Sequence, residues 1–154
     1  MEIPFHSALL NAPQPVIAGL RLRPYSLGHR VILEQLDSAF VAGRFPTHDD
    51  LIASAMICAN DWRGNQKFLR SKWRQWFVMK LWGICAGKFD FTAALIKFHK
   101  YITEGDTMPE LEPPDKNVPM REIMAPACAR IYLFLRAHGW SEAEAWDTPI
   151  NVAH

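Results

Sequence analysis

The middle of the chain, residues 63–88, carries seven basic side chains, no acidic one, and three of the protein's six tryptophans. At 100° per residue four of these cations fall in one helical stripe about 60° wide, and an adjacent arc is apolar and aromatic. The stripe holds Arg63, Lys67, Arg70 and Arg74, and the arc holds Leu69, Trp73, Trp76 and Phe77. The pattern predicts one long central helix with its aromatic rings packed inward. A basic groove for nucleic acid or a docking surface for an acidic partner would use the same residues.

Gly, Pro and capping residues divide the rest of the chain into shorter helices. Helix starts are expected after Ser26, Thr47, Asp90 and Ser141, the last in a Ser-x-x-Glu capping box. A fifth helix is expected over about residues 119–138, with Pro126 either in its first turn after a break or at a kink. Together with the central helix, these segments predict an all-α bundle of five to six helices in a single domain spanning residues 1–154.

Two segments are expected to lie outside the helices. Residues 1–24 contain four prolines and a short apolar/basic alternation at 20–23, which predicts an extended arm or one brief strand. Residues 105–118 are acidic and proline-rich, which predicts an exposed loop.

The charge distribution favours pairing within the molecule. The net charge is +1; with seven basic residues in 63–88, ten basic residues face sixteen acidic ones elsewhere, a balance of −6. Binders of nucleic acid are usually basic overall, because affinity grows with the number of phosphates neutralised. We therefore expect the acidic loop, from this chain or a neighbouring copy, to complement the basic stripe, and we do not expect a nucleic-acid partner.

No enzyme, metal or cofactor motif is present in the sequence. The six histidines never occur at the spacing that puts two ligands on one helix face, and no nucleophile or phosphate-loop signature occurs. The three cysteines are scattered singly, as expected of free thiols in a reducing compartment. With no signal peptide pattern and no apolar run of about 20 residues, we expect a soluble cytoplasmic protein that does not enter membranes.

Tryptophans near helix ends are the remaining candidates for binding. Trp62, Trp140 and Trp146 lie at turns, where partial exposure is expected, and large aromatic side chains dominate protein interfaces. Together with the four cations of the stripe they form the predicted partner-binding set.

Two stretches carry a resemblance to a known group of proteins. The first is Leu22-Arg23-Pro24-Tyr25-Ser26-Leu27-Gly28-His29 with the leucine-rich helix after it, and the second is Ala145-Trp146-Asp147-Thr148-Pro149-Ile150. Both are similar to the small helical tail-morphogenesis proteins of tailed phages and prophages, some of which are tail assembly chaperones.

This resemblance implies a non-enzymatic assembly factor in the host-cell cytoplasm. Its implied partner is another protein, the tape-measure protein or a different tail component. Apart from the resemblance, a homo-oligomer is a further expectation for this chain. The alternative is a nucleic-acid-binding or host-directed regulatory protein that uses the basic aromatic helix.

Overall fold

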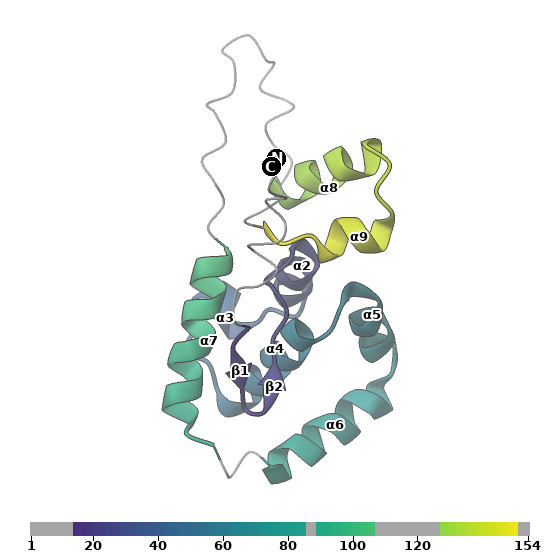
Figure 1. The fold of residues 1–154 in the computed structure, drawn as a ribbon. Helices are drawn as coiled ribbons and strands as arrows, with labels where there is room; N and C mark the ends of the chain where they lie inside the picture. The colour runs from purple at the N-terminus through teal and green to yellow at the C-terminus, as the bar shows by residue number, and fades with distance from the viewer. Residues whose placement is uncertain (1–13, 86–88, 107–126, 151–154) are drawn as a thin grey trace.

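The structure is a computed structural model that describes residues 14–85, 89–106 and 127–150 (Figure 1). These residues form eight helices and one two-stranded hairpin, so the predicted all-α class is confirmed. The helices outnumber the five to six expected, because two of the predicted helices are each divided in two. None of the helices in these three ranges is both long and apolar enough to cross a membrane.

The N-terminal arm is described from residue 14, and this part of it folds back on itself. Strands β1 (Val16–Ile17) and β2 (Leu20–Arg21) pair antiparallel, with Ile17 opposite Leu20. The two loop residues, Ala18 and Gly19, both have positive φ, 49° and 80°. Two positive φ angles match the right-handed twist of a tight hairpin. Ile17 is buried, so the hairpin anchors this part of the arm in the core.

The first predicted helix is divided into α2 (Leu27–Gln35) and α3 (Ala39–Ala42). Ser26 caps α2 as predicted, accepting a hydrogen bond from the backbone N–H of His29. The helix stops because Asp37 adopts a positive φ of 51°, after which the Ser38 N–H returns to the Leu33 carbonyl. The chain therefore changes direction before α3 begins.

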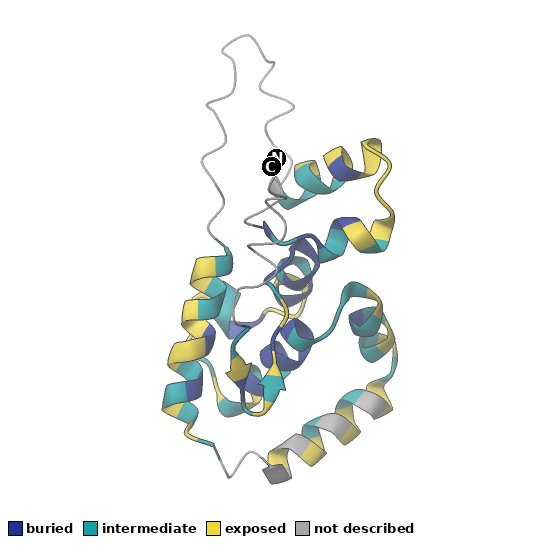
Figure 2. Cartoon of the chain, viewed as in Figure 1, coloured by how far each residue is buried: buried dark blue, intermediate teal, exposed yellow. Residues whose placement is uncertain are grey.

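Helix α4 (His48–Ala59) lies at the centre of the fold. Thr47 and Asp50 form a reciprocal capping box at its start, with the Thr47 N–H 2.8 Å from the Asp50 carboxylate. Leu51, Ala55 and Cys58 are completely buried. Figure 2 shows the buried positions concentrated along α2 and α4.

The prediction of one long central helix is wrong. The segment forms α5 (Trp62–Arg70) and α6 (Lys72–Cys85), separated at Ser71, whose φ of −113° and ψ of 95° are extended. Gln75 stabilises the break, since its side-chain amide donates to the Leu69 carbonyl at 2.9 Å. The last carbonyls of a helix lack partners within it, and Gln75 supplies one.

Helix α7 (Phe91–Gly105) begins at its predicted cap, Asp90, and buries Phe98. The Tyr101 hydroxyl donates to the Arg23 carbonyl at 2.7 Å, which ties α7 to the chain after the hairpin. At its end, Asp106 pairs with Arg30 of α2.

Helices α8 (Ala127–Ala137) and α9 (Glu142–Asp147) form a hairpin over α2. The predicted capping box between Ser141 and Glu144 is present. Residues 107–126 lie outside the described residues, so the greater part of the predicted acidic loop and the Pro126 prediction cannot be compared with the structure. The predicted free thiols are found at Cys58 and Cys128, and the Cys85 side chain is outside the description.

Candidate protein-binding surface

Four large apolar side chains are exposed on one face of α6. Trp73 is 71% exposed, Trp76 58%, Leu81 52% and Phe77 47%. On a helix with 3.6 residues per turn they project within an arc of about 140° over about 12 Å. We call these four residues the α6 ridge. The prediction that Trp73, Trp76 and Phe77 pack inward is therefore wrong.

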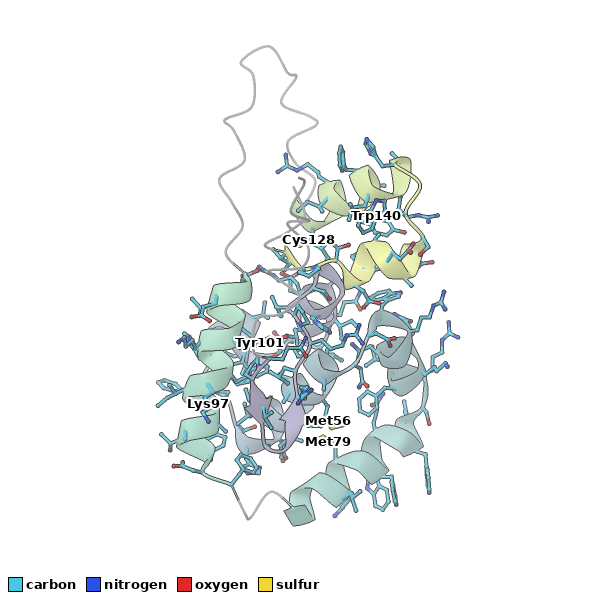
Figure 3. All side chains as sticks on the ribbon, in the orientation of Figure 1. Met56, Met79, Lys97, Tyr101, Cys128 and Trp140 are labelled. Atoms are coloured by element: carbon cyan, nitrogen blue, oxygen red, sulfur yellow. The ribbon has the colours of Figure 1, made fainter. Side chains whose placement is uncertain are left out.

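The break at Ser71 explains why the ridge faces outward. The expectation that these aromatic residues face inward assumes one continuous helix. Helix α6 instead has its own axis and contacts the core through a different face. Its described contact with the core runs through Met79, which packs on Ile52 and Met56 of α4. Figure 3 labels Met56 and Met79 next to one another. Because Met79 and Gln75 occupy the inner side, the ridge residues project to the opposite side.

The ridge contains both a ring stack and positive charge. The rings of Trp73 and Phe77 lie parallel, 8° apart, with centroids separated by 5.5 Å. Lys80 is exposed and projects inside the arc of the ridge, and Lys72, also exposed, projects about 40° outside it. An apolar ridge with one lysine inside it and a second beside it is a surface for an apolar partner that carries carboxylates.

The predicted cationic stripe is divided with the helix. Arg63, Lys67 and Arg70 are exposed on α5, and none of them forms an ion pair with another described residue. Arg74 belongs to α6, so it cannot continue a stripe that requires one helix axis; its side chain lies outside the description. The Arg63 charge has only a small effect on the pKa of the Glu144 carboxylate of α9. Its pKa is lowered mainly by the hydrogen bonds from Ser141, with Arg63 a smaller contribution.

Trp62 and Trp146, two of the three predicted binding tryptophans, contact each other inside the molecule. Their rings stack with centroids 4.9 Å apart, and Trp146 stacks in turn on Tyr132 at 4.3 Å. The Asp147 carboxylate accepts the Trp62 backbone N–H at 2.7 Å. Stacked aromatic pairs stabilise a fold by more than the burial of their apolar surface alone would give. These two tryptophans therefore join α5, α8 and α9.

Trp140, the third predicted tryptophan, lies at the turn between α8 and α9 (Figure 3) and is 39% exposed. Its carbonyl accepts a hydrogen bond from the Arg136 guanidinium at 2.7 Å. It is far from α6 along the chain, and no described contact joins it to the ridge. The predicted set is thus distributed over separate parts of the surface.

The ridge was absent from the predicted set, although one signal for it exists in the sequence. Ser71 is a serine in the middle of a helical pattern, where its hydroxyl competes for backbone hydrogen bonds and favours helix ends. If a new helix starts at Ser71, its orientation is independent of α5. The aromatic residues of α6 then need not lie on the same face as Leu69 of α5.

A buried histidine, His29, joins the start of α2 to the end of α4. His29 Nδ1 accepts the Ser26 N–H at 3.2 Å, so the ring proton resides on Nε2, which donates to the Asn60 carbonyl at 2.8 Å. Burial lowers the pKa of His29 below its usual value of 6.5, which keeps the ring neutral. Both hydrogen bonds of its ring are to the main chain, as expected of a structural residue.

An apolar groove lies on a different part of the described surface from the ridge. This groove of about 720 Å³ lies between α3 and α7, with Phe40, Leu95 and Ile96 in its lining. Within the described residues, no group of three or more His, Cys, Asp or Glu side chains is arranged to hold a metal ion.

Comparison of the chain with models of known protein families, with curated protein sequences and with solved structures finds no match. The function is therefore argued from the surface of the molecule itself.

Proposed function

We propose that this protein is a non-enzymatic assembly factor that binds another protein through the α6 ridge. The supporting observation is the exposure of Trp73, Trp76, Phe77 and Leu81 on one face of a single helix. Contiguous apolar patches are uncommon on monomeric proteins and mark places where a partner binds. Tryptophan is the residue most enriched at the energetic centres of such interfaces.

The tail-morphogenesis role comes from the two stretches that resemble phage tail proteins. In the structure these stretches, at opposite ends of the chain, are hydrogen-bonded to each other. The Leu27 N–H donates to the Thr148 carbonyl at 3.1 Å, and the Ile150 N–H donates to the Tyr25 carbonyl at 3.1 Å. Their similarity to one group of proteins thus concerns a single structural unit, which supports treating them together.

Co-expression with tail proteins tests this function. The chain is produced with the tape-measure protein of a tailed phage, and separately with other tail proteins of that phage. We expect one of them to gain solubility and to elute with this chain in size-exclusion chromatography. The variant Trp73→Ser/Trp76→Ser should lose the complex. The variant Ile96→Ser, at a 64% exposed apolar position on α7, is the matched control and should keep it. No complex with any tail protein would contradict the proposal.

A second candidate, nucleic-acid binding, is supported by Arg63, Lys67 and Arg70. All three are exposed, without ion pairs to described residues. Binding to DNA or RNA through these side chains would weaken steeply as salt rises, because each phosphate contact releases counterions. Filter binding of a DNA duplex and a single-stranded RNA over a salt series measures this. Retention that is absent or independent of salt removes the candidate.

A further inference from the structure

We infer that the partner of the α6 ridge is an acidic amphipathic helix, which lies along α6 with its apolar stripe on the ridge. This inference rests on the proposed function and names the chemistry of the partner. It is carried by three properties of the described surface: its charge, its shape and the mutual stacking of its rings.

The charge along α6 and its flanking residues is of one sign. Residues 62–89 contain no acidic side chain, while Lys72 and Lys80 of α6 are both exposed. The carboxylates that flank this stretch are already engaged as helix caps. Asp61 accepts the Gly64 N–H at 2.6 Å, and Asp90 accepts the Ala93 N–H at 3.1 Å. The ridge cations are thus available to carboxylates from outside the stretch.

The shape of the ridge fits a helix. Trp73, Phe77 and Leu81 are spaced four residues apart, and rows at this spacing form the ridges that insert into the grooves of a packed helix. The row is about 12 Å long, so a partner helix of about three turns covers it. Lys80 projects within the arc of the ridge, so a bound partner would need a carboxylate opposite it, flanked by apolar residues that contact the ridge. That pattern is an apolar stripe bordered by Glu or Asp.

The same features disfavour other occupants. Two copies of this chain that met face to face along α6 would place both sets of α6 lysines in one interface, to which residues 62–89 contribute no carboxylate, and like charges across an interface are repulsive. Single-stranded nucleic acid binds by stacking its bases on open aromatic faces. The rings of Trp73 and Phe77 are instead parallel to each other, so each shields one face of the other.

Peptide binding by the full chain tests the inference. Three fluorescent peptides of about 18 residues are compared by anisotropy, a length at which a helix is stable enough to bind. The first has a Leu stripe bordered by Glu, the second has the same composition with the Leu residues distributed around the helix, and the third has Lys in place of Glu. We expect the first to bind at least about tenfold more tightly than the others.

Variants of the ridge locate the site. Trp76→Ala should weaken the acidic peptide about 30-fold, the loss expected at a hot-spot tryptophan, whereas the control Ile96→Ala should leave it unchanged. Lys80→Glu should weaken the acidic peptide and strengthen the Lys peptide, since it reverses the charge inside the ridge. Equal melting temperatures of the variants show that each one is folded.

Four results would overturn the inference. These are equal binding of the first two peptides, binding unaffected by Lys80→Glu, binding only to vesicles that contain phosphatidylserine, and binding only to an oligothymidine. If a tail-protein complex forms but none of the peptides binds, the proposed function stands and only the inference of an acidic helical partner is removed. If the acidic peptide binds but no tail-protein complex forms, the tail-assembly role is removed and the inference about the ridge stands.

Discussion

Gly28 provides a sharp test of the packing that positions α5. A Cβ atom added there would lie 2.9 Å from Cε3 of the Trp62 ring and 3.0 Å from the backbone oxygen of Trp146. Contacts this short force a shift, and the backbone oxygen belongs to α9, which is held by its own hydrogen bonds. Overpacking of a well-filled interior costs about 1–3 kcal/mol. Against this, replacing Gly by Ala in a helix gains up to about 1 kcal/mol.

We therefore expect Gly28→Ala to lower the free energy of unfolding by about 1–2 kcal/mol. Gly83 is the matched control, because it also lies within a helix but an added Cβ would have no described atom beyond its own helix turn within 4 Å. Gly83→Ala should raise the free energy of unfolding by about 0.5–1 kcal/mol. The two substitutions have the same chemistry, so their opposite signs isolate the contact with Trp62 and Trp146.

Urea unfolding followed by far-UV circular dichroism measures both variants. The midpoint should fall for Gly28→Ala and rise for Gly83→Ala, with the slope unchanged. In thermal unfolding, each kcal/mol corresponds to about 2–4 °C for a chain of this length. In a double-mutant cycle, Trp62→Leu should recover part of the Gly28→Ala loss, because it removes one of the two close atoms. A Gly28→Ala variant as stable as Gly83→Ala would refute the close packing of Gly28 against Trp62 and Trp146.

Three further predictions concern buried or capping groups. Burial lowers the pKa of His29, so below about pH 6.5 the unfolded chain takes up a proton that the folded chain does not, and stability should fall by about 1.4 kcal/mol per pH unit down to the folded pKa. Urea midpoints at several pH values measure this slope, and His29→Gln should flatten it. An equally steep slope in that variant would show that a group other than His29 causes the pH dependence. Asp147→Ala removes the acceptor for the first N–H of α5 and should cost about 1–2 kcal/mol in urea unfolding. Asp147→Asn should cost less, since its amide oxygen can accept; equal losses would show that the charge itself is what matters. Cys58 is completely buried and its pKa is raised to about 12, so with Cys85 and Cys128 changed to Ser it should react with Ellman's reagent only on unfolding. Fast reaction of the folded protein would contradict this.

The helix starts could be predicted from the sequence because capping is local. Ser26, Thr47, Asp90 and Ser141 each accept a backbone N–H in the first turn of the helix that follows. The side chain and its partner are three residues apart, so the signal lies within one short window. The all-α class follows from the same windows and from the helical spacing of the apolar residues.

The break at Ser71 could not be read from periodicity, and the candidate site depends on it. A continuous helix and two helices of different direction share the same apolar spacing over short windows. Here the break is stabilised by Gln75, which donates to the end of α5, and by Met79, which packs on α4. The Gln75 hydrogen bond is local, but the Met79 contact joins residues more than twenty positions apart. The orientation of the aromatic face was therefore decided by packing that a helical wheel does not contain.

The internal role of Trp62 and Trp146 was missed for a related reason. These residues are 84 positions apart in the chain, and neither periodicity nor composition reports which distant residues meet. Position at a helix end correctly indicated partial exposure for all three tryptophans. It could not distinguish Trp140, at the tip of a hairpin, from two rings that stack against each other.

The same internal contacts bear on how well the ridge can bind. Asp147 accepts the first N–H of α5, the ring of Trp146 packs against that of Trp62, and Gln75 caps the other end of α5. Met79 then anchors α6 on the central helix. Ordering flexible groups costs free energy on association, and a surface already fixed by its supports avoids much of that cost. A ridge held in this way retains more of the free energy of its buried aromatic rings as affinity, which is why we place the binding site on α6 instead of on the hairpin tip that carries Trp140.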